Sequence, residues 1–311
     1  MSRFAVLYRS LARQPGYTLM RGVARFRLAR STVAMSRRIL HAPRIRRLLA
    51  EHEARMDQTQ FKGIHLERFV AELRHQGIAY GLRLPAETVD AIVAWAKVNP
   101  CFADRAERCG FLLADRARAE QTLGKPILLA QYFNAAEDCS AIARLADDPA
   151  LRWIAVSYLQ SDPTFVGANL WWTFPVAALE ADREQHAHVF HRDVDDFRFF
   201  KFFFYLTDVP EGEGAHVCVV ASHRHPPARG LFDRWNIRRY TDQEIAHSYA
   251  AHQIHEICGP AGTGFAENTL CVHKGSTPKT TARLLLQLQF ALFDYGAMHD
   301  RRPRHALQRI A

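Results

Sequence analysis

The 311-residue chain has no uncharged apolar run of the roughly 18 residues that a membrane-spanning helix requires. Its N-terminus is positively charged but lacks a continuous apolar segment, so we expect no secretory signal. The six cysteines are scattered, with no Cys-x-x-Cys pair. This usage argues against a disulfide framework or a zinc knuckle and favours reduced thiols in the cytoplasm. Internal repeats and low-complexity tracts are also absent from the sequence.

Basic charge is concentrated at the N-terminus. Residues 1–60 contain 13 arginines, no lysine and three acids, while the whole chain has a net charge of +9, so the remainder is close to neutral. We interpret residues 1–60 as a solvated helical arm that packs on the body. The alternative is a set of basic amphipathic helices that contact an anionic surface at the periphery of the inner membrane. Nucleic acid is not expected as a partner, because the body has no matching basic face.

The rest of the chain, residues 61–311, is expected to form one domain that begins with helices and continues with strands. In the helical part, about 61–160, Val89, Ile92, Val93 and Ala96 form the apolar stripe of an amphipathic helix. Two further short helices are expected on either side of Pro149. From about 161 to 295, short β-favouring runs alternate with turn residues. Helices followed by strands indicate an α+β or mainly β fold, with a sandwich or barrel.

The stretch "HRDVDDFRFFKFFFYL" contains the first candidate site. His191 and Asp193 share a strand face, so both can coordinate one metal ion. A single His-x-Asp is within what chance supplies in a chain with 16 histidines. A third group, His273, ends a later β-type run and completes the 2-His-1-carboxylate pattern of non-haem Fe(II) oxygenases.

Arg283 opens the strand that follows His273. Its guanidinium is suited to hold a carboxylate, such as the far end of 2-oxoglutarate. Along this strand Arg283, Leu285, Gln287 and Gln289 alternate with Leu284, Leu286, Leu288 and Phe290. This alternation predicts a barrel wall whose outer face is covered by the N-terminal helices and whose inner face lines a polar cavity.

Lys201 interrupts an otherwise aromatic strand, "FRFFKFFFYL", which we expect to be covered on both faces. A buried lysine must reach an edge or find an anion. It either snorkels or pairs structurally, or it contacts the cosubstrate or substrate. Trp171 and Trp172 must point to opposite sides of their strand, so at most one faces the cavity, and core packing is the favoured role for both. His188, just upstream of the site, is interpreted as cavity-lining rather than as a metal ligand.

Taken together, "FHRDVDDFRFFKFFFYLTDVPEGEGAHVCVVASHRH" and "GTGFAENTLCVHKGSTPKTTARLLLQLQF" resemble the phytanoyl-CoA dioxygenase superfamily of Fe(II)/2-oxoglutarate oxygenases. The resemblance covers roughly residues 64–295 and excludes the arm. It implies a double-stranded β-helix, or jelly-roll, with His191, Asp193 and His273 as iron ligands and Arg283 as the anchor of 2-oxoglutarate. Some members place a hydroxyl two residues after the distal histidine. Here that position is Gly275, and Ser276 next to it is a further candidate for cosubstrate contact.

The expected function is therefore an Fe(II)- and 2-oxoglutarate-dependent dioxygenase. It would use O2 to hydroxylate an unactivated C–H bond of a small-molecule, lipid or saccharide substrate, with release of succinate and CO2. One alternative is a cupin-like metal-dependent isomerase or hydrolase, which would not need Arg283. Another is a non-catalytic accessory protein that acts at a membrane surface through its basic arm.

Overall fold

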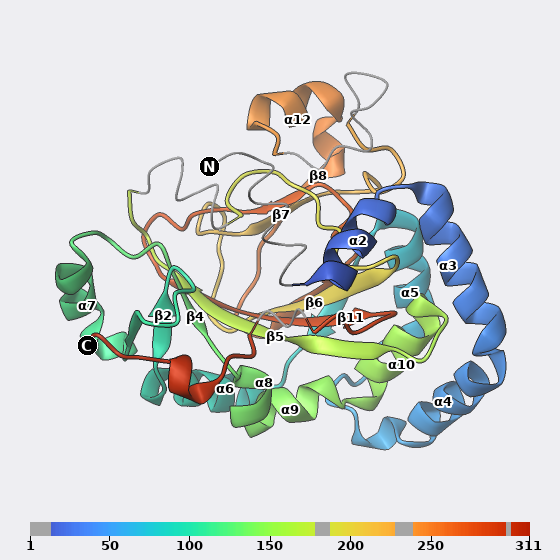
Figure 1. Ribbon diagram of the computed structural model, residues 1–311, viewed down its shortest axis with the longest axis horizontal. Coiled ribbons are helices and arrows are strands. Elements are labelled where there is room, and N and C mark those ends of the chain that lie inside the picture. Colours follow the sequence, from blue (N-terminus) through green and yellow to red (C-terminus); the bar gives the residue numbers. More distant parts are fainter. Residues whose placement is uncertain (1–13, 178–186, 228–238, 297–299) are drawn as a thin grey trace.

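Two antiparallel sheets form the centre of the protein, which is described by a computed structural model over residues 14–177, 187–227, 239–296 and 300–311. The larger sheet has the order β1-β9-β6-β11-β5-β4-β2-β3 and the smaller has the order β10-β7-β8 (Figure 1). The strands are β1 (Ile78–Arg83), β2 (Cys101–Ala103), β3 (Gly110–Phe111), β4 (Leu129–Tyr132), β5 (Thr164–Thr173), β6 (Phe199–Tyr205), β7 (His216–Val219), β8 (Ile254–Ile257), β9 (Thr263–Glu267), β10 (His273–Gly275) and β11 (Arg283–Ala291).

From β5 onward the chain alternates between the two sheets. It leaves β5, pairs His191 with His273 beside β10, and then returns to the larger sheet as β6. Strands β7 and β8 belong to the smaller sheet, β9 to the larger, β10 to the smaller and β11 to the larger. The central neighbours β9-β6-β11-β5 and the pair β10-β7 are therefore not consecutive in sequence, which is the winding of a double-stranded β-helix. The expected jelly-roll fold is confirmed.

Helices cover the outer face of the larger sheet, as Figure 1 shows for α6, α8, α9 and α10. Buried residues of α5, α6, α9 and α10 form one apolar core with the outward-facing residues of β5, β6 and β11. The α-helices are α2 (Pro15–Val23), α3 (Arg27–Leu40), α4 (Ala42–Ala54), α5 (Leu66–Gln76), α6 (Ala86–Val98), α7 (Arg116–Leu123), α8 (Ala135–Asp138), α9 (Ser140–Ala146), α10 (Pro149–Leu159) and α12 (Asp242–Ser248). Short 3-10 turns are η1 (Met56–Gln58), η2 (Leu113–Asp115), η4 (Ala251–Gln253) and η5 (Arg304–Ala306).

Strand β11 has the two faces that its alternation predicts. Leu284, Leu286, Leu288 and Phe290 lie in the core beneath the helices. On the opposite face, Leu285 packs with the inner residues Phe203 and Phe265, and Arg283, Leu285 and Gln287 line a cavity between the sheets. Strand β6 is buried along its whole length, so the prediction that both of its faces are covered is also confirmed.

The N-terminal helices pack on the body over part of their surface. Met20 of α2 and Ala24, which follows the helix, are buried in a small cluster with Val166 and Phe199. In α3, Arg37 donates a hydrogen bond from Nη2 to the Leu292 carbonyl at 3.0 Å. Helix α4 packs against α10. Within the described ranges, no helix is both long and apolar enough to span a membrane.

The strands β1 to β4 differ from the sequence-based expectation, which placed strands only after Pro163. The sequence of residues 65–100 predicts helix, loop and helix, but β1 lies between α5 and α6 and pairs with β9. Strands β2 and β3 lie within residues 101–125, where no element was predicted. These strands are two to six residues long and gain their order from pairing with distant partners, such as Ile78 with Glu267. Local alternation cannot reveal such segments.

Candidate metal centre

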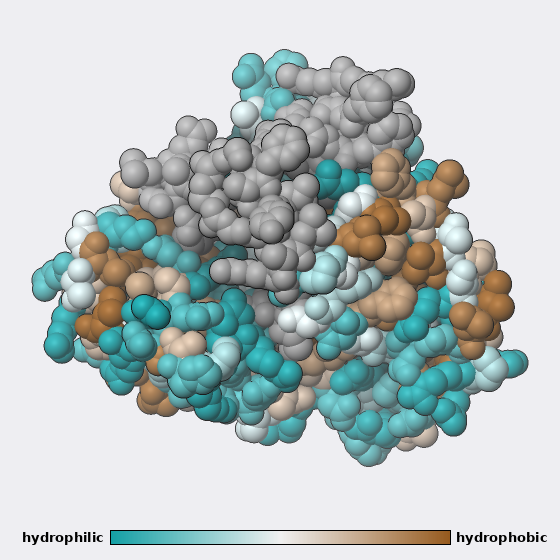
Figure 2. Space-filling model, viewed as in Figure 1, coloured by the Kyte–Doolittle hydropathy of each residue, from teal (hydrophilic) through white to brown (hydrophobic). Residues whose placement is uncertain are grey.

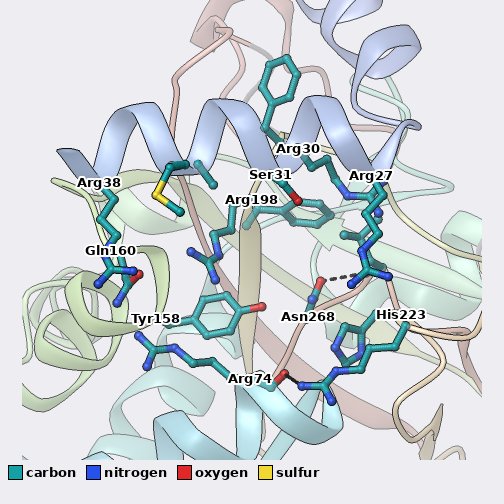
Figure 3. A pocket seen from close by; sticks show the side chains of 16 residues that line it. Arg27, Arg30, Ser31, Arg38, Arg74, Tyr158, Gln160, Arg198, His223 and Asn268 are labelled. Atoms are coloured by element: carbon teal, nitrogen blue, oxygen red, sulfur yellow. Dashed lines mark hydrogen bonds between the residues drawn. The ribbon is translucent and has the colours of Figure 1, made fainter. Parts of the chain in front are cut away.

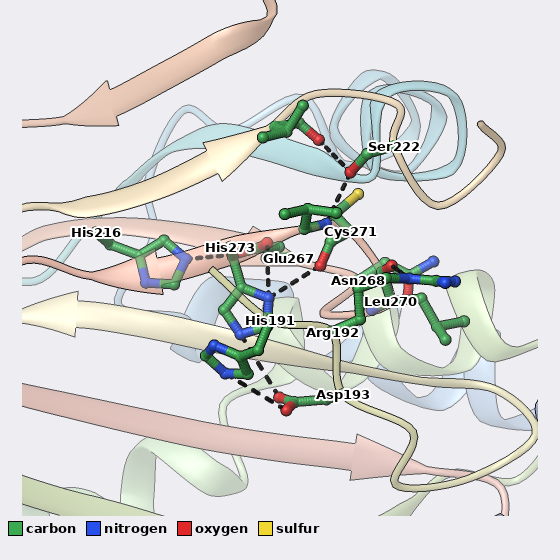
Figure 4. Close-up of polar contacts among 12 residues, drawn as sticks. His191, Arg192, Asp193, His216, Ser222, Glu267, Asn268, Leu270, Cys271 and His273 are labelled. Atoms are coloured by element: carbon green, nitrogen blue, oxygen red, sulfur yellow. Dashed lines mark hydrogen bonds and ion pairs between the residues drawn. The ribbon is translucent and has the colours of Figure 1, made fainter. Parts of the chain in front are cut away.

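Three side chains converge where the smaller sheet meets the larger one. His191 and His273 form a two-residue antiparallel bridge, with reciprocal backbone hydrogen bonds of 2.9 and 3.0 Å. The chain then continues to Asp193, whose backbone N–H donates to the Thr269 carbonyl at 2.8 Å. One donor atom from each of the three side chains lies within 4.8 Å of the others (Figure 4). The three residues singled out by sequence therefore lie together.

The two imidazoles present unprotonated nitrogens to the centre. His191 Nδ1 lies 2.9 Å from the Val189 carbonyl, and His273 Nδ1 lies 3.0 Å from the Cys271 carbonyl. A carbonyl only accepts, so each Nδ1 carries the proton and each Nε2 keeps its lone pair. Burial lowers the pKa of His191, and burial together with His191 lowers the pKa of His273 to about 4. Both rings are consequently neutral near pH 7.

Asp193 is ionised between the two rings. Burial opposes its ionisation, but Lys201, His273 and His191 outweigh burial and hold the pKa of the carboxyl well below its usual range. Its two oxygens lie 3.7 Å from His191 Nε2 and 3.6 Å from His273 Nε2. These separations exceed hydrogen-bond length.

The resulting arrangement fits a metal ion. Two nitrogen lone pairs and one carboxylate face one another, with no proton and no hydrogen bond between them. Such a set of acceptors is mutually repulsive unless a cation lies between them. Two imidazoles and one carboxylate also form the donor set of a facial triad, which leaves open positions on the metal.

Lys201 points into the same cavity, and its charge is compensated within the protein. Its Nζ lies 2.6 Å from Asp193 Oδ2 and 3.0 Å from Asp195 Oδ2. Burial alone would lower the pKa of Lys201, but the two carboxylates reverse that effect and raise the pKa. Lys201 therefore does not snorkel to an edge. It holds Asp193 by one oxygen, while contact with a cosubstrate remains a prediction.

A second hydrogen-bonded pair lies behind His273. His216 Nε2 is 2.5 Å from Glu267 Oε2, and Glu267 Oε1 is 3.9 Å from His273 Nδ1 (Figure 4). Burial lowers the pKa of His216 to about 3 and raises the pKa of Glu267 to about 8. We therefore describe the contact as a hydrogen bond donated by the protonated carboxyl to the neutral imidazole, rather than as an ion pair.

The three candidate ligands line a cavity of about 260 Å³ between the sheets. Its walls are rich in hydrogen-bonding groups, among them the amides of Gln131, Asn169 and Gln287. Gln131 Nε2 donates to Asn169 Oδ1 at 2.9 Å. Trp171 lines this cavity while Trp172 lies in the outer core, so the two rings do point to opposite sides of β5. The expectation of core packing therefore holds for Trp172 and not for Trp171, whose position on the inner face of β5 exposes it to the cavity.

Arg283 lies in the wall of the cavity with its guanidinium buried. Its Nη1 donates to the Gly214 carbonyl and its Nη2 to Thr173 Oγ1 at 3.1 Å, whereas Nε is buried without a hydrogen-bond partner. Among the described residues, no carboxylate forms an ion pair with it. Burial lowers the pKa of the guanidinium. A buried cation with only neutral partners is a place where an anionic group of a ligand gains stabilisation.

The other predicted residues lie close by, with different surroundings. His188 lines the cavity, as expected, and its Nδ1 lies 2.8 Å from Thr277 Oγ1. Ser276 does not belong to the cavity lining, and its backbone N–H donates to the Ala215 carbonyl at 2.9 Å. Several neighbours of the site were not predicted from the sequence. Those that contact it or line the cavity are Arg105, Asp195, His216, Glu267 and Arg302.

The proximity of Asp195 to the site could have been predicted from the sequence. It follows Asp193 by two residues, the same step that separates Asp193 from His191, so it belongs to the same local alternation. No sequence pattern predicts the contacts of His216 and Glu267, because their approach to His273 depends on how the fold places β7, β9 and β10.

The fold and site together define a double-stranded β-helix with a 2-His-1-carboxylate cluster in its cavity. No protein-family model and no curated protein sequence matches the chain. Among solved structures, the chain is similar to SnoN, a non-heme alpha-ketoglutarate-dependent epimerase from nogalamycin biosynthesis. The identity is 16%, the aligned part covers 74% of this chain and 82% of SnoN, and the TM-score is 0.45.

Two further solved structures are similar to the same extent. AviO1 from Streptomyces viridochromogenes Tue57 is 14% identical over 72% of this chain and 94% of its own, with a TM-score of 0.48. HygX from Streptomyces hygroscopicus, solved with nickel and 2-oxoglutarate bound, is 13% identical over 72% and 85%, with a TM-score of 0.49. What this chain binds and does has to follow from its own residues.

Proposed function

We propose that this protein is an Fe(II)- and 2-oxoglutarate-dependent oxygenase. The observation that carries the proposal is the convergence of His191, Asp193 and His273, each with its metal-binding atom free of protons and aimed at a common point. A site of this composition is typical of mononuclear non-haem iron, because three protein ligands leave room for a bidentate cosubstrate and O2.

Arg283 supports 2-oxoglutarate as the cosubstrate. The keto acid end of this molecule chelates a metal, and its other end is a carboxylate that needs a cationic partner. Arg283 supplies an unneutralised guanidinium in the wall of the cavity that contains the three ligands. A charge-assisted, bidentate contact there would replace the water that a buried guanidinium has lost.

The residues around the centre prepare it for this chemistry. The carbonyls of Val189 and Cys271 fix the ring orientation and tautomer of the two histidines, which keeps each Nε2 available. Lys201 holds Oδ2 of Asp193, so that Oδ1 is left for a metal ion. When bound, iron and 2-oxoglutarate supply the oxidation of a C–H bond by O2, with succinate and CO2 as the coproducts.

The lining of the cavity favours a small polar substrate. Amide groups of Gln131, Asn169 and Gln287 can donate to and accept from hydroxyl groups, and Trp171 offers an aromatic face. A long alkyl chain would leave the Gln287 amide and the Asn169 amide nitrogen without new hydrogen-bond partners, which costs free energy. We therefore favour hydroxylation of a hydroxyl-bearing molecule such as a saccharide over hydroxylation of a lipid chain.

The metal assignment is tested by Asp193→Ala, with Asp242→Ala as the matched control at an exposed position. Under anaerobic conditions, the wild type and the control should bind one Fe(II) per chain and develop the charge-transfer absorption of an Fe(II)–2-oxoglutarate chelate. Asp193→Ala should lose both signals. Retention of iron at wild-type affinity by Asp193→Ala would refute the metal site.

The role of Arg283 is tested by Arg283→Gln in the presence of a bound divalent metal. Loss of one charge-assisted contact is worth about 1.5–3 kcal/mol, so the Kd for 2-oxoglutarate should rise about 10- to 100-fold. The Kd for 2-oxobutyrate, which lacks the second carboxylate, should change little. An equal effect on both acids, or none on either, would contradict this role and favour a metal isomerase or hydrolase that does not use 2-oxoglutarate.

A further inference from the structure

A second cavity, of about 490 Å³, lies between helix α3 and the body (Figure 3). No residue lines both this cavity and the one that contains the metal centre. No Asp or Glu is among its described lining residues. Six arginines line it, and we call it the arginine cavity: Arg27, Arg30, Arg38, Arg74, Arg198 and Arg224.

Several of these arginines are held by neutral partners. Arg30 Nη1 donates to the Ala24 carbonyl at 2.7 Å, and Arg74 Nη2 donates to the Ser157 carbonyl. The Arg198 guanidinium lies 5.5 Å from the centroid of the Tyr158 ring. Within the described part of the chain, none of the six forms an ion pair with a carboxylate. Their positive charge is therefore oriented but not neutralised.

Burial and neighbouring positive charges both lower the pKa of two of these arginines. Burial, Arg192 and Arg27 lower the pKa of Arg30 to about 10. Burial and Arg198 lower the pKa of Arg74. A cluster of confined like charges gains stability when an anion enters it. The arrangement of planar, multiply donating guanidinium groups is well matched to a phosphate.

Apolar side chains are exposed on the same helices. Of the nine large apolar side chains that are exposed in the described residues, seven lie between Leu19 and Leu40. Leu28, Met35 and Ile39 are spaced so that they share one face of α3, and they are 82%, 54% and 68% exposed. In Figure 2 this region appears as brown surface over α2 and α3, at the upper right.

Arginines and exposed apolar residues in one helical segment point to a single kind of partner. Residues 14–50 contain nine arginines and no acidic residue. A nucleic acid would satisfy the arginines but would leave the leucines in water. A membrane with anionic phospholipids satisfies both, because its acyl region accepts apolar side chains and its headgroups carry phosphate.

We propose that α2 and α3 dock on the surface of a membrane that contains anionic phospholipids, with the phosphate of one headgroup in the arginine cavity. The helices remain packed on the body through Met20, Ala24 and Arg37, so docking holds the whole protein at the membrane surface. This inference uses no residue of the metal centre and stands independently of the proposed function.

The charge contribution is tested by co-sedimentation of the full chain with two kinds of vesicles. One kind is pure phosphatidylcholine, and the other contains phosphatidylglycerol as well. The variant Arg27→Gln with Arg38→Gln removes two charges at the rim of the arginine cavity. The control Arg108→Gln with Arg118→Gln removes two exposed charges near β2 and α7, at the other end of the molecule in Figure 1.

Wild type and control should bind the phosphatidylglycerol vesicles and not the pure phosphatidylcholine vesicles. Each basic residue near an anionic surface contributes about 1 kcal/mol, so the rim variant should partition roughly 30-fold more weakly. Equal losses in both double variants would overturn the arginine cavity as the site, since net charge alone would then explain binding. Absence of any binding by the wild type would overturn the proposal.

The apolar contribution is tested by Leu28→Glu against Val98→Glu, which changes a side chain that is 73% exposed at the end of α6. Leu28→Glu should weaken vesicle binding by at least about tenfold, because a leucine leaves the acyl region and a like charge approaches the anionic surface. Val98→Glu should have no effect. Equal behaviour of these two variants would overturn insertion of α3.

The source of the phosphate is settled by competition. Inorganic phosphate at millimolar concentration should not release the protein from the vesicles, because it offers no apolar contact. Release by free phosphate would show an anion site without membrane docking. Tighter binding to duplex DNA than to the anionic vesicles, unaffected by Leu28→Glu, would show a nucleic-acid surface instead. Either result would overturn the proposal.

Discussion

Replacement of Lys201 by methionine should destabilise the metal-free protein far more than replacement of an exposed lysine. Lys201 is 6% exposed and lies 2.6 and 3.0 Å from the carboxylates of Asp193 and Asp195. Methionine has a similar length and no charge, so Lys201→Met removes the cation that both carboxylates contact. Removal of one partner from a buried ion pair costs about 3–5 kcal/mol. That is a large share of a typical folding free energy of about 5–15 kcal/mol.

Lys125 provides the matched control. It forms an ion pair with Asp104 at 2.5 Å, but its side chain is 44% exposed. Exposed pairs contribute about 0.2–1 kcal/mol, so Lys125→Met should lower the free energy of unfolding by no more than about 1 kcal/mol. Both variants are compared by urea denaturation in the presence of a chelator, because a divalent cation would itself neutralise Asp193.

A double variant identifies the cause of the loss. Asp195→Asn in the Lys201→Met background removes the charge of one of the two carboxylates and keeps the side-chain shape. It should therefore recover part of the lost stability, whereas Asp195→Asn alone should not stabilise the protein. Two outcomes would refute this reasoning: a cost for Lys201→Met that equals the cost for Lys125→Met, or a double variant that is less stable than Lys201→Met.

Three further predictions concern stability in urea. The pKa of Glu267, about 8 against an ordinary 4.5, means that the native state holds this proton more tightly than the unfolded state. The free energy of unfolding should therefore fall as pH rises above about 7.5, where the histidines that are neutral in the native state no longer take up protons in the unfolded state, by up to about 1.4 kcal/mol per pH unit, and Glu267→Gln should abolish the slope. Gly77→Ala should cost more than about 2 kcal/mol, because φ is +78° and a Cβ would collide with the Cys271 sulfur, whereas Gly124→Ala, with φ +65° and open space, should cost only about 1 kcal/mol. Asp148→Ala should cost about 2 kcal/mol, because the carboxylate caps α10 by accepting from two backbone N–H groups, and an unchanged urea midpoint would contradict this.

Local periodicity explains why much of the site could be predicted from sequence. The alternation that starts at Arg283 is a property of a single strand. The step of two from His191 to Asp193 is a local spacing as well, although the structure has only a β-bridge at His191 and no strand through Asp193. The strand that follows Arg283 has an apolar face in the core and a polar face toward the cavity, as its letters indicate. The turn before it brings Arg283 into the cavity that His273 also lines.

Contacts that depend on strand register could not be predicted in this way. Lys201 lies opposite Gln289 on one side and Glu267 on the other, and only this pairing decides which groups surround it. The same holds for the arginine cavity. The arm was recognised as basic, but Arg74 and Arg198 come from α5 and from the position immediately before β6, and nothing in the sequence associates them with α3.

Strand β6 shows how the protein separates two basic environments. Lys201 points inward, where Asp193 and Asp195 neutralise it, so the metal centre is close to charge balance before a cation enters. Arg198, immediately before this strand, lies on the outer side against Tyr158, an aromatic ring that attracts the cation without cancelling its charge. The charge of Lys201 is therefore compensated by the carboxylates that it holds, whereas the charge of Arg198 remains available to an external anion. This difference in compensation, rather than the number of basic residues, is why we assign the outer cavity to a phosphate and the inner lysine to the support of Asp193.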